Sequence, residues 1–179
     1  MSFATQVNYA NATFNEQLQS PQLEEALAAM DTNENAIIVE NRFGTFAVKP
    51  ESIIRFETGL VGFSALREFA LLLIPGTESG NKFRLLQSLE DANLSFIVMP
   101  TTLATTLLTA DDAASLAKEH GIENDYLLMI FIATLREQMG KVQMTLNVRA
   151  PIIMDTSKGT ALQVVLTNND YAMQLPVKG

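Results

Sequence analysis

The sequence predicts a mainly β protein: a compact antiparallel β-barrel-like or sandwich domain with one or two short helices, preceded by an N-terminal extension that contains a short helix. Short apolar or alternating runs follow one another at close spacing from residue 37 onward, which is typical of small barrels and sandwiches. A helical pattern interrupts these runs once. The composition of residues 1–35 differs from that of residues 36–179. We therefore expect an extension (1–35) followed by one β domain (36–179), since a chain of 179 residues fits a single core.

The extension combines an Asn-, Gln- and Thr-rich start with one helix signature. Residues 1–35 carry five acids and no Lys or Arg, whereas residues 36–179 carry 15 acids and 12 bases. Ser20 and Pro21 suit the N-cap and first helical position, and acids follow in the next turns. The pattern predicts an amphipathic helix at about 20–31. A helix of about three turns is unstable alone in water, so we expect it to lie on the body or on another chain.

The β domain is predicted from ten strand-like runs separated by turn signals. In FRLLQSL, alternate residues fall on opposite faces, as in a pleated strand. In LLMIFIAT both faces are apolar, which indicates a strand covered on each side or, alternatively, a buried helix. The predicted strands are Ile37–Asn41, Thr45–Val48, Ile53–Phe56, Phe69–Ile74, Phe83–Leu89, Ser95–Met99, Leu127–Thr134, Gln143–Val148, Pro151–Met154 and Gln163–Leu166.

One helix is predicted inside the β domain. Thr109 followed by Asp112 forms a capping-box pattern, and Gly121 is placed to end the helix with Ile122 packing back. His120, the only histidine, falls in the last turn. A polar side chain there interacts well with the terminal carbonyl groups, so we interpret His120 as a helix-end residue rather than a catalytic one.

The sequence shows no pattern that indicates catalysis. There is no cysteine, which excludes disulfides and thiol chemistry, and no metal-ligand spacing or phosphate-binding loop is present. The acid pairs at 90–91 and 111–112 are typical of turns and helix starts, although a carboxylate acid/base pair stays a remote alternative. We therefore expect a protein that is not an enzyme and that needs no metal or cofactor.

The charge and hydropathy patterns indicate partners and compartment. The net charge is −8, which repels phosphate backbones and favours a basic protein partner over direct contact with nucleic acid. The longest apolar run, 127–135, is far shorter than the roughly 20 residues of a membrane helix. The first positive charge is Arg42, so the start does not read as a secretory signal. We expect a cytoplasmic protein without membrane contact.

The stretch FETGLVGF, residues 56–63, places apolar side chains in a segment that its two glycines mark as a turn or irregular loop. Glycine permits positive φ or a close approach of the backbone to another surface. One hypothesis puts Phe56 and Phe63 in the core, with Leu60 and Val61 partly exposed. The alternative packs all four side chains inward.

Three blocks of the sequence resemble the flagellar assembly factor FliW family. They read ESIIRFETGLVGFSALREFALL, FRLLQSLEDANLSFIVMP and NVRAPIIMDTSKGTALQVVLTNNDYAM, and together they span about Ile37 to Met173. Family members carry prolines where this chain has Glu57 and Val61, a glutamate at Thr58 and often an aromatic residue at Arg84. The proline that commonly follows the Glu90-Asp91 turn is also missing here.

The resemblance implies a non-enzymatic regulator with two protein partners. FliW-like proteins hold the translational repressor CsrA, so that it no longer silences flagellin messenger RNA, and exchange it for newly made flagellin. The extension could then dock on the body, mimic a flagellin helix or pair two molecules. Acids on loops beside apolar side chains suit an interface with an apolar centre and a charged rim. The candidate partner contacts are Glu57, Leu60, Val61, Glu90 and Asp91.

A second class of function stays open from the sequence. Small β barrels can enclose a ligand, and an apolar interior with Met129 and Phe131 could hold a lipid or another small molecule. The same side chains would also fill a core that holds no ligand. A buried cavity would favour ligand binding, whereas a packed interior would argue against it.

Overall fold

The computed structural model describes residues 35–77, 81–138 and 140–177, and only the backbone of Gln138. The predicted helix at about 20–31 and almost all of the extension lie outside the described residues. The statements about them therefore stay predictions.

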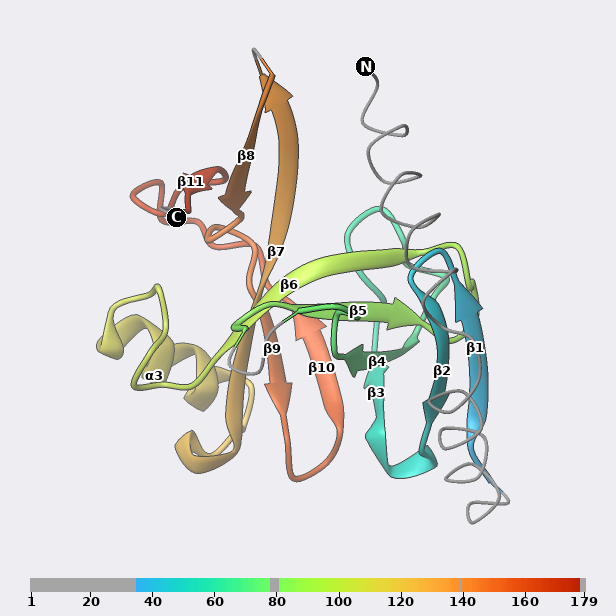
Figure 1. Cartoon of the computed structure of the whole chain (residues 1–179). Coiled ribbons are helices and arrows are strands. Elements are labelled where there is room, and N and C mark those ends of the chain that lie inside the picture. The colour runs from blue at the N-terminus through green and yellow to red at the C-terminus, as the bar shows by residue number, and fades with distance from the viewer. Residues whose placement is uncertain (1–34, 78–80, 139, 178–179) are drawn as a thin grey trace. The chain divides into compact units, whose positions relative to one another are not determined.

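Seven strands form a closed barrel, because β9 pairs back onto β7 at the end of the order β7-β6-β5-β4-β3-β10-β9 (Figure 1). Neighbouring strands are antiparallel except β3 and β10, which run parallel and pair at only two positions. A closed ring with an odd number of strands cannot alternate throughout, so one parallel pair is unavoidable. The structure thus confirms the barrel and corrects the antiparallel prediction at this pair. The barrel strands are β3 (Ile53–Phe56), β4 (Glu68–Leu72), β5 (Arg84–Ser88), β6 (Ser95–Thr101), β7 (Leu127–Gln138), β9 (Ile152–Asp155) and β10 (Thr160–Gln163).

In the part of the chain that the structure describes, four further strands lie outside the ring. β1 (Ile37–Asn41) and β2 (Gly44–Val48) pair with each other as a ribbon. β8 (Lys141–Leu146) pairs with the C-terminal half of β7, and the short β11 (Leu175–Pro176) pairs with β8. Residues 147–151 then lie opposite only two residues of β7, so the chain bulges between β8 and β9. Two short 3-10 turns, Pro50–Ser52 and Asn124–Tyr126, precede β3 and β7.

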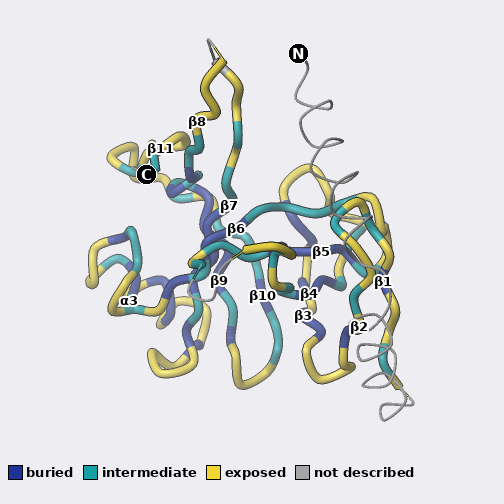
Figure 2. The backbone as a smooth tube through the Cα atoms, in the orientation of Figure 1, coloured by how far each residue is buried: buried dark blue, intermediate teal, exposed yellow. Residues whose placement is uncertain are grey.

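The core has an interior and two outer layers. Every barrel strand contributes to the interior cluster, which is lined by Ile54, Phe56, Leu60, Phe69, Leu86, Val98, Ile130, Ile152 and Ala161. A second cluster packs β7 and β9 against the helix α3 (Ala110–Glu119) and the C-terminal segment. A third cluster joins the β1–β2 ribbon to β3 and β4. Figure 2 shows this burial along the inner strands, with exposed residues gathered at the turns.

The LLMIFIAT segment is a strand with both faces covered, as predicted. Its even-numbered residues, such as Ile130, pack in the barrel interior. Its odd-numbered residues, Met129 and Phe131, pack in the outer cluster beside α3 and are fully buried. The strand is longer than predicted, because β7 continues past the barrel to pair with β8.

The strand boundaries differ from the prediction mainly after residue 140. The last barrel strand is Thr160–Gln163 rather than Gln163–Leu166, and β11 was not predicted. Residues 164 and 166 still donate backbone hydrogen bonds, to the carbonyls of Pro151 and Arg149. The apolar run therefore extends beyond the regular strand into an irregular segment, which alternation alone cannot separate from it.

The internal helix agrees with its prediction. The Thr109 hydroxyl accepts the N–H of Asp112 at 3.2 Å, Gly121 has φ +66°, and Ile122 is buried. The second half of the capping box is absent, because the Asp112 carboxylate accepts the Tyr171 hydroxyl instead. Tyr171 also accepts the N–H of Thr109, so the C-terminal segment caps α3.

Candidate functional site: the acidic loop surface

The loop after β3 folds back through two consecutive turns. Gly59 and Gly62 have φ +69° and +86°, in the left-handed region that favours glycine. The Phe63 N–H donates to the Leu60 carbonyl at 2.8 Å, and the Leu66 N–H donates to the Phe63 carbonyl at 3.1 Å. The two glycines therefore reverse the chain twice within the FETGLVGF stretch.

Both sequence hypotheses for this loop were partly wrong. Phe56 is buried and Val61 is 67% exposed, as the first hypothesis expected. Leu60, however, is only 2% exposed and belongs to the barrel interior, whereas Phe63 is 38% exposed. The Phe63 ring packs edge-on against Phe96 of β6, with centroids 5.4 Å apart. Leu60 thus anchors the loop in the barrel interior. Phe63 has the partly exposed position that the first hypothesis gave to Leu60.

The second block supplies a tight acidic turn between β5 and β6. The Ser88 hydroxyl accepts the N–H groups of Glu90 and Asp91 at 3.2 and 3.1 Å. The Asp91 carboxylate accepts the N–H of Asn93 at 2.9 Å. Both acidic side chains stay exposed. The turn therefore presents two negative charges on a backbone fixed by side-chain hydrogen bonds.

The acidic turn and the glycine loop are joined by one carboxylate. Oε2 of Glu90 accepts the N–H groups of Arg67 and, at 2.9 Å, Glu68. These are the last residue of the loop segment and the first of β4. The Phe56 N–H donates to the Arg67 carbonyl, so the exposed residue Glu57 directly follows a residue that pairs with this junction. Two blocks that are separate in the sequence thus meet at one end of the barrel.

The third block reaches the same loop through Gln163 at the end of β10. Its Oε1 accepts the N–H of Val61 at 2.9 Å, and its Nε2 donates to the Ala150 carbonyl at 3.1 Å. One side chain therefore joins the glycine loop to the bulge at 147–151. We call the exposed set Glu57, Val61, Phe63, Glu90 and Asp91 the acidic loop surface.

Four of the five predicted contact residues belong to this surface, and Leu60 does not. Phe63 was missed as a surface candidate, because the sequence alone does not tell which apolar residue of a double turn points inward. The two glycines were the available signal, since a double reversal breaks simple alternation.

The described residues hold no group of three or more His, Asp or Glu side chains that could bind a metal ion. The pKa of the Asp155 carboxyl is lowered to about 2 by Lys158 and by the hydroxyl and N–H of Ser157. Its Oδ2 lies 2.7 Å from Nζ of Lys158. These contacts stabilise the turn between β9 and β10, so the lowered pKa of Asp155 is explained by its role in holding that turn.

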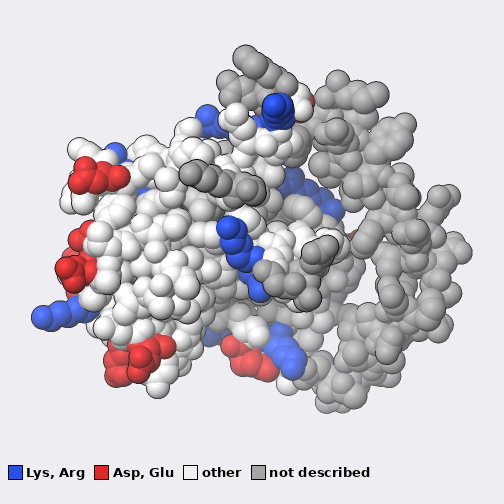
Figure 3. Space-filling model, turned by 60° about the vertical axis from the view of Figure 1, so that its left-hand side comes forward, with Lys and Arg blue, Asp and Glu red and all other residues white. Residues whose placement is uncertain are grey.

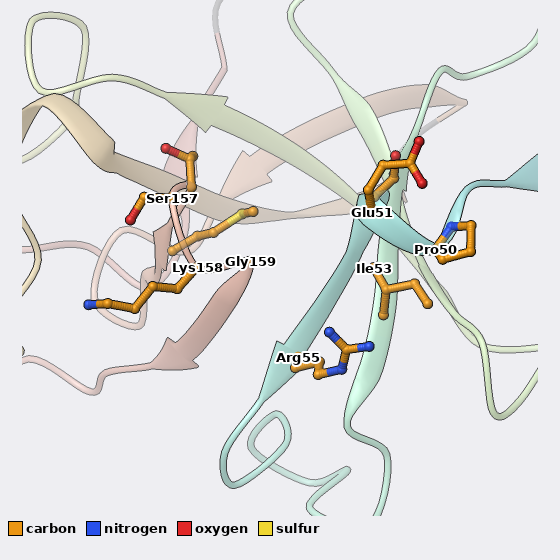
Figure 4. Close-up of a pocket in the computed structure, with 10 residues that line it drawn as sticks. Pro50, Glu51, Ile53, Arg55, Ser157, Lys158 and Gly159 are labelled. Carbon is orange, nitrogen blue, oxygen red and sulfur yellow. The ribbon is translucent and has the colours of Figure 1, made fainter.

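A depression of about 300 Å³ lies between the 50–55 segment and the 154–159 turn. Figure 4 shows that Arg55, Glu51 and Lys158 point in different directions around it. Arg55 is paired with Glu68, and Lys158 with Asp155. Met129 and Phe131, which the ligand-binding alternative placed in a lined cavity, are packed in the core beside α3. The geometry gives that alternative no support.

The fold and this site define a small closed β barrel that presents loops at one end and carries a ribbon and a helix as outer layers. The sequence profile of the FliW protein family matches residues 37–177. The chain belongs to the FliW family.

Relatives and a solved structure agree with this assignment. Proteins named flagellar assembly factor FliW from Desulfitobacterium hafniense and Natranaerobius thermophilus are 33% and 31% identical, over 76% and 78% of this chain and 88% and 91% of theirs. The relative of the same name from Bdellovibrio bacteriovorus is 32% identical over 79% of this chain and 78% of its own. A crystal structure of the flagellar assembly factor FliW superposes with a TM-score of 0.61 at 25% identity, covering 79% of this chain and 97% of that one.

Proposed function

We propose that this chain is a non-enzymatic flagellar assembly and translation-regulation factor. In this role it binds a CsrA-type translational regulator, relieves repression of flagellin synthesis, and releases that regulator when it binds flagellin. Membership of the FliW family supports the flagellar role, since the relatives are named flagellar assembly factors. The observation that carries the proposal is the convergence of three family blocks on the acidic loop surface.

The chemistry of this surface suits a basic protein such as an RNA-binding repressor. Val61 and Phe63 provide exposed apolar side chains, and Glu57, Glu90 and Asp91 provide three exposed acids, with the exposed base Arg67 beside Glu90. Interfaces commonly combine these two features, with the apolar centre supplying affinity and the charged rim steering the encounter. We assign Leu60 a supporting role, since it holds the loop from the barrel interior.

Exchange between the two partners would give feedback by mass action. Flagellin bound to this chain lowers the effective affinity for CsrA, through overlapping or coupled sites, and CsrA lowers the affinity for flagellin by the same factor. When flagellin accumulates, the repressor is released and flagellin translation falls.

Direct binding to nucleic acid or membrane has no part in this proposal, which places the protein in the cytoplasm. Figure 3 shows Lys and Arg scattered over the visible face rather than gathered in a stripe, with carboxylates near its edge. Nucleic-acid sites usually need such a stripe. Among the described helices, none has the length and apolar character to cross a membrane.

Calorimetric titration with purified CsrA and flagellin tests the proposal. We expect CsrA to bind at micromolar concentration or below and to be displaced by flagellin. Phe63→Ser should weaken CsrA binding by roughly tenfold or more, since a truncated interface anchor costs about 1–2 kcal/mol or more. Asp91→Lys should weaken it more at low salt than at high salt.

Glu119→Lys is the matched control, because Glu119 is an exposed acid on α3. Its affinity for CsrA should stay close to that of the wild type. Equal losses of CsrA affinity in Asp91→Lys and Glu119→Lys would show that CsrA does not bind at the acidic loop surface. Failure of the wild-type protein to bind either partner, or turnover of a substrate by it, would contradict the proposed function.

A further inference from the structure

Gln87 of β5 is a polar side chain that is fully buried. Its Oε1 accepts the side-chain N–H of Asn41, which ends β1, at 2.6 Å. Its Nε2 lies near four backbone carbonyl oxygens of the following turn. These belong to Ser88 at 2.8 Å, Leu94 at 3.1 Å, Ala92 at 3.2 Å and Asp91 at 3.3 Å.

A single amide nitrogen thus holds the inside of the acidic turn. It has only two N–H groups for the four carbonyls, so the turn must keep its shape for these contacts to persist together. The opposite side of the turn is held by the Ser88 hydroxyl. Removing the Gln87 amide would take away the side-chain donor inside the turn, although the Leu94 and Asp91 carbonyls would keep the N–H groups of Ser88 and Leu94 as backbone donors.

The effect reaches beyond the turn through Glu90. The backbone of Glu90 belongs to the turn that Gln87 holds, and its carboxylate accepts the N–H groups of Arg67 and Glu68. A displacement of the turn therefore moves the carboxylate away from these amides. At its other end, Gln87 is bonded to Asn41 of the β1–β2 ribbon. The hydrogen bonds form one chain from the ribbon to the glycine loop.

We propose that Gln87 is a positioning residue for the acidic loop surface, and that the Asn41–Gln87 hydrogen bond couples the β1–β2 ribbon to that surface. The inference rests on the proposed function only in treating this surface as the partner site. The coupling itself is a property of the fold. A displacement of β1 would then shift Glu90 and the loop that carries Val61 and Phe63.

Two substitutions test the hydrogen bonds of Gln87 separately. Gln87→Met keeps a side chain of similar length and removes the amide. Asn41→Asp keeps the acceptor for the N–H of Phe43, which Asn41 holds at 2.7 Å, but removes the donor to Gln87. Asn168→Asp is the matched control, because exposed Asn168 accepts the N–H of the residue two positions on in the same way.

Site-resolved hydrogen exchange gives the readout, which needs no partner protein. In Gln87→Met, the amides of Arg67 and Glu68 should exchange about tenfold faster, the factor that corresponds to roughly 1.4 kcal/mol of local opening. In Asn41→Asp, the same two amides should exchange roughly threefold faster or more, since one hydrogen bond is lost. Amides of α3 should keep their rates, and Asn168→Asp should change neither group.

Unchanged exchange at Arg67 and Glu68 in both variants would overturn the inference. So would an equal acceleration at α3, because that result means a general loss of stability rather than positioning. If Gln87→Met unfolds, the Asn41→Asp result alone decides the coupling.

Titration of Gln87→Met with CsrA then separates the two proposals. We expect weaker binding, because the acids of the turn no longer rest in the wild-type arrangement; faster opening alone, with the closed form still dominant, would leave the affinity unchanged. If exchange at Arg67 and Glu68 is faster but the wild type does not bind CsrA, the positioning role of Gln87 is supported and the proposed function is contradicted. Faster exchange with unchanged CsrA affinity would show that Gln87 does not position a partner contact.

Discussion

Replacing Gly59 by alanine tests the geometry of the glycine loop, with Gly62→Ala as its matched control. Both glycines have positive φ, so alanine at either position would be destabilised by backbone strain of about 1–2 kcal/mol. Both substitutions also reduce the freedom of the unfolded chain to a similar extent. These two effects cancel when the variants are compared with each other.

The surroundings of the two positions differ sharply. A Cβ at Gly59 would lie 2.6 Å from the Phe63 carbonyl oxygen, 2.8 Å from that of Leu66 and 2.8 Å from the Cα of Ser64. These are backbone atoms, so no side-chain rotation relieves the contact. A Cβ at Gly62 would meet nothing within 4 Å. Overpacking of this kind costs roughly 1–3 kcal/mol, which is the expected difference between the two variants.

Thermal unfolding followed by circular dichroism measures that difference. One kcal/mol shifts the Tm of a chain of this size by roughly 2–4 °C, so Gly59→Ala should melt roughly 2–12 °C below Gly62→Ala. Equal melting temperatures would refute the reasoning, because they would mean that the loop does not approach its own backbone at Gly59.

Three further predictions concern the side chains of the same loop, the turn between β9 and β10, and the cap of α3. Leu60→Ala should lower the free energy of unfolding by about 2–5 kcal/mol, whereas Val61→Ala should change it by less than about 0.5 kcal/mol; urea denaturation of both variants checks this. The lowered pKa of Asp155, about 2, stabilises the fold above the ordinary value of 3.8, and this contribution is lost as the pH falls through about 2. The stability advantage of wild type over Asp155→Asn should therefore be full at pH 6 and shrink toward pH 2, as measured by urea midpoints across that range. Tyr171→Phe should raise the pKa of Asp112, which the Tyr171 hydroxyl holds below its ordinary value; an NMR titration that finds no rise would count against the cap on α3.

The sequence predicted the elements that depend on local pattern. The helix at α3 has a capping residue, an apolar face and a terminal glycine that all lie within one short segment. β7 is recognisable because both of its faces are apolar. Closure of the ring was not predictable in detail, since the parallel pairing of β3 with β10 joins segments about one hundred residues apart. Alternation within each strand carries no information on that pairing.

The candidate site was predictable as a set of acids beside a glycine loop, but the arrangement of these residues was not. Glu90 was predicted as an exposed contact, and its bonds to Arg67 and Glu68 depend on how β4 pairs with β5. Gln87 looked like one polar residue in an alternating strand. Its importance arises because the next turn folds its carbonyl groups back onto the side chain.

The two-residue parallel pairing between β3 and β10 has a consequence for how the chain reaches its native state. This contact closes a loop of about one hundred residues, and the entropy of loop closure must be met before the pairing contributes stability. We therefore expect the ring to shut late in folding, after the antiparallel hairpins have formed. Until then, both strands present free edges that can pair with another chain, so nascent protein should be prone to aggregate until this last junction is made.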